Sequence, residues 1–267
     1  MYRSKRWQIL LAVLSIAVIV LSACAPTATV PAAPADGEQA AVEGEAKTLR
    51  VNLGTFPEML DPQKSSFVNE IANLKMAYEG LTRQDGDLAT VPAAAESWAY
   101  NEDATQLTFT LREGLLYADG SPLNAERFAY SIRRNIDPTT AGEYAAITDE
   151  ILGAPEWRAC GEDAAACEAA KAQVMESVAA SHADGAACTG YDDAECNTLT
   201  LTFSRPAPYF HVVSSLWVTF PAKEELITAG GENWWLDAAN HVGRPVRDEH
   251  ARAGCAGALH AERQLLG

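Results

Sequence analysis

Six cysteines carry the most reactive side chains of this sequence, and the first, Cys24, has the surroundings of a lipid attachment site. Leu21, Ser22 and Ala23 precede it, and small residues just before a cysteine suit the cleft of a signal peptidase. In such signals the thiol receives a diacylglyceryl group before cleavage, and two or more acyl chains give stable anchoring. We therefore expect Cys24 to become the lipidated first residue of the mature chain.

The segment before this cysteine has the order of a secretory signal. Arg3, Lys5 and Arg6 precede an apolar run that extends to Leu21 and contains no charged residue. The run is shorter than the ~20 residues that a helix needs to cross a bilayer. Residues 1–24 are thus predicted to be a lipoprotein signal peptide, and a membrane anchor or a buried helix is the alternative.

The composition changes twice after the signal. Residues 25–46 are rich in Ala, Pro, Gly and acidic residues and contain no aromatic side chain. Such a segment cannot bury enough apolar surface to fold, so we expect a disordered tether. Regular apolar patterns begin at Lys47, and the structured body is expected over residues 47–243.

Four cysteines lie inside this body, in an Ala- and Asp-rich stretch: Cys160, Cys167, Cys188 and Cys196. An exported compartment favours disulfides over free thiols. The short separations favour pairing the first with the second and the third with the fourth, although four cysteines allow three pairings. A zinc site, the alternative, would require tighter spacing. We expect residues 155–197 to form a surface excursion closed by these bonds.

The sequence carries no marker of catalysis. A Gly-x-Ser-x-Gly elbow, a His-Glu-x-x-His motif and a Gly-rich phosphate loop are absent from it. His182, His211 and His241 are isolated, so we interpret them as surface or packing residues, and Asp192-Asp193 as part of a solvated loop. The net charge of -16 disfavours nucleic acid as a partner. We therefore expect a protein that is not an enzyme and uses no cofactor or metal.

Two stretches of the body alternate apolar and polar residues, which predicts half-buried strands. The first runs from Leu49 to Leu53. The second places Leu107, Phe109 and Leu111 on one face. Each stretch is therefore expected to turn one face towards a common core.

Two other stretches predict helices. Apolar residues recur at three- and four-residue steps from Phe67 to Leu81, and this helix is expected to end near Gly80. Asn124 is a predicted N-cap for a second helix, which would bury Phe128 and Ile132.

Three motifs follow one another in the body: Tyr78–Leu81 (YEGL), Thr110–Gly114 (TLREG) and Tyr117–Glu126 (YADGSPLNAE). Together with the opening LRVNLGTFPEMLDP and the later TLTLTFSRPAPYF, they resemble the extracellular solute-binding proteins of family 5, which are peptide- and nickel-binding receptors of ABC importers. The resemblance implies an α/β fold: the N-terminal portion of a type II periplasmic-binding-protein-like fold, with a mixed sheet, flanking helices and the second lobe missing.

The resemblance also implies a ligand cleft between two lobes. Thr55 and Phe56, on the loop after the first strand, and Trp217, in an apolar segment, are candidate ligand contacts. For Phe56 and Trp217 the alternative is that an aromatic side chain beside a strand packs in the core. Trp234 and Trp235 are expected to pack at the hinge.

One position departs from the family pattern. Arg127-Phe128 stands where the family more often has an acidic residue and a small aliphatic one. We expect this change to alter a surface contact and to leave the fold unchanged.

The function that these features imply is capture of a small solute outside the cell membrane. We expect a substrate-binding lipoprotein, anchored to the outer face of the cell membrane or in the periplasm. It would deliver oligopeptides or similar solutes to an ABC permease. Nickel complexes and oligosaccharides are alternative ligands, and a non-transporting surface lipoprotein that binds another protein is the alternative function.

Residues 244–267 do not continue the family pattern. They contain four Arg, no Lys and no aromatic residue, with Cys255 among them, whereas the family would follow Gly243 with Gly-Pro-Phe or Gly-Pro-Tyr. Back-translation from Arg244 with the first base dropped permits Gly-Pro-Phe-Val-Met-Asn, and the final codons permit Asn-Tyr-Trp. We therefore expect a frameshifted tail in place of the second lobe, and a genuine Arg-rich tail is the alternative.

Sequencing the gene tests this expectation. We expect a one-base slip near the codon of Arg244 and coding sequence for a second lobe downstream. An intact frame, with a stop shortly after the Gly267 codon and no such sequence beyond it, would contradict the slip.

Overall fold

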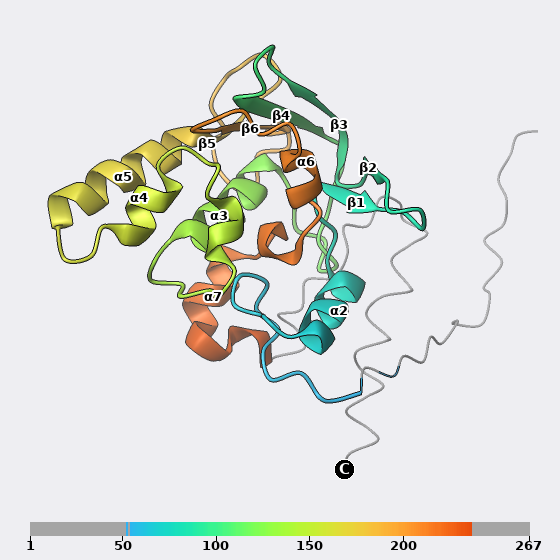
Figure 1. The fold of residues 1–267 in the computed structure, drawn as a ribbon. Coiled ribbons are helices and arrows are strands. Elements are labelled where there is room, and N and C mark those ends of the chain that lie inside the picture. Colours follow the sequence, from blue (N-terminus) through green and yellow to red (C-terminus); the bar gives the residue numbers. More distant parts are fainter. Residues whose placement is uncertain (1–51, 53, 237–267) are drawn as a thin grey trace, which may run out of the picture. The chain divides into compact units, whose positions relative to one another are not determined.

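The computed structural model describes residues 52 and 54–236 (Figure 1). The chain divides into two units, Met1–Glu45 and Ala46–Gly267, and every described residue belongs to the second. The signal, Cys24, the tether and the tail at 244–267 lie outside the described residues, and so does the strand expected at Leu49–Leu53 except for Asn52, which is described and is not in a strand. Within the described part, no helix combines the length and the apolar character needed to span a membrane.

A four-stranded antiparallel sheet forms the centre of the fold, in the order β3-β4-β6-β5 (Figure 1). Its strands are β3 (Ala95–Tyr100), β4 (Gln106–Leu111), β5 (Val178–Ser181) and β6 (Thr198–Thr202). A separate hairpin pairs β1 (Thr82–Gln84) with β2 (Thr90–Pro92). The α/β class is confirmed, and all strand pairs among residues 82–202 are antiparallel, without the parallel pairs that a mixed sheet also contains.

One face of this sheet is apolar, as the alternating pattern predicted. Leu107, Phe109 and Leu111 of β4 are buried, and Leu199 of β6 lies opposite Phe109. Residues between them point to the other face, where the hydroxyls of Thr108 and Thr200 lie 3.3 Å apart. The period of two thus gives the sheet one core face and one more polar face.

Helix α3 (Ala125–Ile136) covers the core face and packs on β5 and β6 (Figure 1). The side chain of Asn124 accepts a hydrogen bond from the backbone N–H of Arg127, which confirms the predicted N-cap. Phe128 and Ile132 are fully buried, as the helical spacing indicated.

Helix α2 is shorter than the sequence predicted, extending over Val68–Ala77. Phe67 lies before its first turn and is 63% exposed, so it does not pack in the core. The buried Glu70 side chain explains this start, because its carboxylate accepts the backbone N–H groups of Ser66 and Phe67. An acidic group that caps from inside the first turn is favoured by the helix dipole.

Gly80 is not a helix stop, because the chain is already extended at Tyr78. A Cβ at position 80 would lie 2.9 Å from the carbonyl oxygen of Ser214, closer than a side chain tolerates. The glycine therefore permits a close backbone approach between β1 and the segment after α6 (Phe210–Val213).

The cysteine-containing stretch is part of the core and not a surface excursion. It contains α4 (Ala154–Ala159), α5 (Ala164–Ser177) and β5, which is the edge strand of the central sheet. Val174 and Val178 are fully buried in the main core. Disulfides join Cys160 to Cys167 and Cys188 to Cys196, the pairing that the short separations favoured.

The remaining helical segments follow β6 and precede the tail. They are η3 (Trp217–Thr219), α7 (Glu224–Gly230) and η4 (Gly231–Leu236), and a further turn, η2 (Ala145–Thr148), follows α3. Trp234 and Trp235 of η4 are buried in a small cluster with Ala222, as expected of packing residues.

A buried ion pair joins these parts. Arg134 of α3 binds both carboxylate oxygens of Asp61, at 2.6 and 2.7 Å. The same carboxylate accepts the indole N–H of Trp234, and Arg134 also donates to the side chain of Gln63. The Asp61 side chain is 2% exposed and that of Arg134 11%, so water screens the pair little.

Replacing Arg134 by Met tests how much the fold depends on this pair. Arg134→Met leaves the Asp61 carboxylate buried without its cation, and we expect a loss of about 3–5 kcal/mol in the free energy of unfolding. The matched control is Arg205→Met, whose side chain is 69% exposed and pairs with Glu150; here we expect less than about 1 kcal/mol. Denaturant unfolding followed by circular dichroism measures both. Similar losses of unfolding free energy in the two variants would contradict the claim that the fold depends on the buried pair of Arg134 and Asp61.

Candidate functional site

The loop that carries Thr55 and Phe56 is exposed and held by short-range hydrogen bonds. Phe56 is 71% exposed, although it is a large apolar side chain. The side-chain amide of Asn69, in the first turn of α2, donates to the carbonyl oxygens of Thr55 and Phe56 at 3.5 and 3.3 Å. Both predicted contact residues are therefore presented to solvent from a backbone tied to a helix.

The end of this loop is fixed more firmly. The backbone N–H of Met59 donates to Glu70 at 2.9 Å, and Asp61 is part of the buried ion pair with Arg134. The side-chain amide of Gln63 donates to two carbonyl oxygens of the 218–220 segment, each at 3.1 Å. A loop with a rigid base can hold an exposed aromatic side chain in one place, which lowers the entropy cost of binding.

Trp217 lies inside the protein, so the packing alternative describes it better than ligand contact. It is 8% exposed, and its indole N–H donates to the carbonyl oxygen of Ser65 at 2.8 Å. Its ring meets that of Tyr144 edge-on, with centroids 5.0 Å apart, and it belongs to a cluster with Leu74 and Tyr78. The indole N–H, the only polar group of this side chain, is thus already hydrogen-bonded within the protein.

The structure does not bring the three predicted residues together as one surface. Thr55 and Phe56 are attached to α2 through Asn69, whereas Trp217 is attached to the chain just before α2 through Ser65. Of the three residues, Phe56 and Thr55 therefore stay candidates for ligand contact, and Trp217 is a packing residue.

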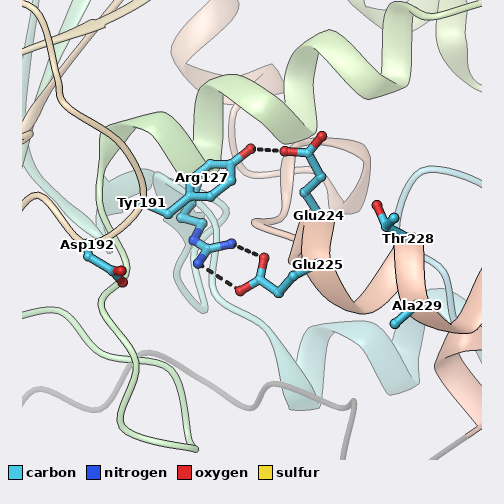
Figure 2. A pocket seen from close by; sticks show the side chains of 7 residues that line it. All are labelled: Arg127, Tyr191, Asp192, Glu224, Glu225, Thr228 and Ala229. Carbon is cyan, nitrogen blue, oxygen red and sulfur yellow. Dashed lines mark hydrogen bonds and ion pairs between the residues drawn. The ribbon is translucent and has the colours of Figure 1, made fainter.

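A pocket of about 590 Å³ lies elsewhere, between α3, α7 and the loop closed by Cys188 and Cys196 (Figure 2). Its lining residues are Arg127, Tyr191, Asp192, Glu224, Glu225, Thr228 and Ala229. The guanidinium of Arg127 binds both oxygens of Glu225, at 2.5 and 2.9 Å, and its central carbon lies 3.9 Å from the centre of the Tyr191 ring. The Tyr191 hydroxyl donates to Glu224 at 2.6 Å.

The charges of this pocket are largely matched within it. Burial acts to raise the pKa of Glu225, but the hydrogen bonds from Arg127 outweigh it and hold that pKa below its usual value. Burial and the hydrogen bond to the Glu224 carboxylate both raise the pKa of Tyr191. Arg127 and Glu225, and Tyr191 and Glu224, are therefore partners of one another, although Nε of Arg127 is buried without a hydrogen bond. The pocket is best explained as a joint between the loop and α7.

Arg127 corrects the expectation of a changed surface contact. Its side chain is only 3% exposed, because the Tyr191 ring covers it and Glu225 neutralises it. The substituted position thus carries a buried connection to the cysteine-containing stretch. The sequence shows that this position is unusual but does not show its partners, Tyr191 and Glu225, which are about 60 to 100 residues away along the chain.

Comparison with known proteins adds the decisive observation. The model of the family described as bacterial extracellular solute-binding proteins, family 5 Middle, matches residues 89–243, which is more than half of the chain. The chain belongs to this family. Its members bind solutes and are not enzymes. The match also runs through the cysteine-containing stretch, which the sequence motifs alone had left uncovered.

Individual relatives agree with the family. The periplasmic oligopeptide-binding protein OppA of Escherichia coli is 34% identical over 71% of this chain and 31% of its own length. The probable deoxycholate-binding periplasmic protein YgiS of the same organism is 31% identical over 70% of this chain and 31% of its own. The chain thus spans about a third of the length of these curated relatives.

Solved structures of peptide-binding proteins are also similar to this chain over part of their length. Haemophilus influenzae OppA in complex with RPPGFSPFR superposes with a TM-score of 0.59 at 25% identity, covering 75% of this chain and 35% of the other. The murein tripeptide-binding protein MppA of Escherichia coli gives 0.54 at 28% identity, with coverages of 69% and 32%. The described residues therefore fold like one part of a periplasmic binding protein.

Truncating the two aromatic candidates separates their roles. We expect Trp217→Ala to lower the free energy of unfolding by about 3–5 kcal/mol, because it leaves a cavity and an unpaired carbonyl on Ser65. Phe56→Ala, at an exposed position, should change it by less than about 0.5 kcal/mol. Thermal or denaturant unfolding of both variants decides this, and a stability loss at Phe56 comparable with that at Trp217 would show that Phe56 packs.

Proposed function

We propose that this chain is the ligand-binding lobe of a substrate-binding lipoprotein of an ABC importer, and that oligopeptides or similar solutes are its ligands. The supporting observation is the exposed Phe56, held on a loop with a buried base in a protein of a solute-binding family. An aromatic ring in such a place offers a ligand apolar contact area at small entropic cost.

The relatives support peptides as the ligand class. OppA of Escherichia coli is named for oligopeptide binding, and MppA of the same organism for murein peptide binding. YgiS, named as probably binding deoxycholate, shows that related chains are assigned to other solutes as well. Peptides are our first choice, with nickel complexes and oligosaccharides as ligands to be tested beside them.

Cellular location is a second part of the proposal. Export is supported by the periplasmic relatives and by the N-terminal signal pattern. Lipid attachment at Cys24 would hold the protein at the outer face of the cell membrane or in the periplasm, and residues 25–46 would give it reach towards a permease. Permease and ATPase genes next to this gene would support import.

Calorimetry on the full-length gene product tests the ligand. Titration with di- to pentapeptides is expected to release or absorb heat and to raise the melting temperature, since a ligand that binds the native state stabilises it. Absence of heat and of a thermal shift with every peptide would count against peptide transport. It would favour another solute or the non-transporting lipoprotein that binds another protein.

A side-chain variant connects this test to the loop. Phe56→Ala is expected to weaken peptide binding about tenfold, corresponding to about 1.4 kcal/mol, with the free energy of unfolding unchanged. Leu88→Ala is the matched control, since Leu88 is 74% exposed at the turn between β1 and β2 and should leave affinity unchanged. If the parent and Phe56→Ala bind peptide with equal affinity, Phe56 does not contribute to the binding site.

A further inference from the structure

The loop between β5 and β6 gathers metal-binding side chains that the family's solute-binding role does not explain. His182 directly follows β5, and Cys188, Asp193 and Cys196 lie along the loop that returns to β6. A nitrogen of His182, the sulfur of Cys188 and a carboxylate oxygen of Asp193 all lie within 4.8 Å of one another. Cys196 lies outside this group of three, but its sulfur is bonded to that of Cys188 and is therefore adjacent to the group.

The spacing of these atoms is close to that of a zinc site. Zn²⁺ in proteins binds four ligands, with sulfur at ~2.3 Å and nitrogen or oxygen at ~2.0–2.2 Å. Ligand atoms around such a tetrahedron are about 3.3–3.8 Å apart. Small side-chain rotations would therefore bring His182, Cys188 and Asp193 onto one ion. Two sulfurs, one imidazole and one carboxylate are also ligands that Zn²⁺ accepts.

The imidazole of His182 and the carboxylate of Asp193 are held by each other and by neighbouring groups. Nε2 of His182 lies 2.8 Å from Oδ2 of Asp193, and Nδ1 faces the carboxylate of Glu195 at 3.7 Å. A histidine that binds metal through one nitrogen commonly donates its other N–H to a carboxylate. The backbone N–H of Glu195 donates to Oδ1 of Asp193, and Thr189 donates to Oδ2, which fixes the carboxylate.

In the structure the disulfide occupies both sulfurs, so metal binding requires its reduction. We propose that reduction of the Cys188–Cys196 disulfide converts this loop into a Zn²⁺ site formed by His182, Cys188, Asp193 and Cys196. A dithiol donor supplies two electrons and two protons, the S–S bond breaks to give two thiols, and the donor becomes a disulfide. Binding of Zn²⁺ then releases the two thiol protons as the thiolates coordinate the ion.

The loop keeps its position without the disulfide, because its backbone is bonded to the start of α3. The side-chain amide of Asn124 donates to the carbonyl oxygens of Gly190 and Asp193, at 2.9 and 3.1 Å. The backbone N–H of Ala125 donates to the carbonyl of Cys196 at 2.8 Å. These bonds tie the backbone at Gly190, Asp193 and Cys196 to the start of α3, and none of them involves a sulfur atom.

The charged groups that face His182 are Asp193, Glu195 and Asp184. All three are acidic, and their field attracts a divalent cation to this loop.

Metal titration of the full chain tests the proposal. The chain carries Cys24→Ser and Cys255→Ser to remove thiols outside the described residues. It is reduced with a phosphine, which becomes a phosphine oxide with oxygen from water, and is freed of reductant without air. We expect one Zn²⁺ per chain by atomic absorption after gel filtration, and thiolate-to-metal charge-transfer absorption when Co²⁺ replaces Zn²⁺. The oxidised chain should bind at least 100-fold more weakly.

Variants distinguish this site from the other cysteine pair. His182→Ala and Cys196→Ser should each weaken Zn²⁺ binding by 100-fold or more, and Glu195→Gln by about tenfold, as for a group that orients a ligand. Asp192→Asn, an exposed neighbour, and the double variant Cys160→Ser/Cys167→Ser should bind as the parent does. Circular dichroism of each oxidised and reduced chain confirms that the fold is retained before titration.

Three results would overturn the proposal. One is a folded, reduced parent chain that retains no Zn²⁺. Another is Zn²⁺ binding by His182→Ala with the affinity of the parent, which would make His182 only a partner of Asp193. The third is loss of the Co²⁺ charge-transfer bands in the Cys160→Ser/Cys167→Ser variant, which would place the metal on the other pair.

Discussion

The buried pair of Asp61 and Arg134 is the interaction on which the rest of this structure depends. It ties the segment before α2 to α3, and Trp234 extends the connection to η4 through the same carboxylate. Burial acts to lower the pKa of Arg134, but the hydrogen bond and the charge of Asp61 outweigh it and raise that pKa, so the guanidinium stays charged inside the protein. Such a pair tolerates little change in the positions of its two side chains, because an unpaired charge in a low-dielectric interior carries a large desolvation cost.

The candidate ligand loop takes its position from this pair. Gln63, two residues after Asp61, bonds to the 218–220 segment, and Gly142 allows the chain to pass over it, since a Cβ there would lie 2.1 Å from the Gln63 carbonyl oxygen. The backbone that follows Phe56 is therefore fixed from several sides, while the Phe56 ring itself is free to meet a ligand. Rigid support beneath an exposed aromatic group is a common arrangement in binding sites.

The cysteine-containing stretch is joined to the domain by three different kinds of contact. Its strand β5 completes the sheet, its Tyr191 covers the buried Arg127, and its last cysteine accepts a backbone hydrogen bond at the start of α3. The cysteine loop therefore accounts for part of the environment of the unusual arginine. Without Glu225 and the ring of Tyr191, Arg127 would be a buried charge with no partner. The same loop also carries the side chains of the inferred zinc site.

The sequence alone determined the elements whose signals are local. The alternation at Leu107, Phe109 and Leu111, the cap at Asn124 and the two short disulfides follow from neighbouring residues, and the family motifs gave the α/β class. Only the tertiary structure decided the rest. It showed that α2 ends before Gly80, that Trp217 packs, that Arg127 is buried, and that His182 meets Asp193. Trp217 and Arg127 depend on partners far away in the sequence, and His182 meets Asp193 only because the loop between β5 and β6 folds back on itself. No local period or propensity records such contacts.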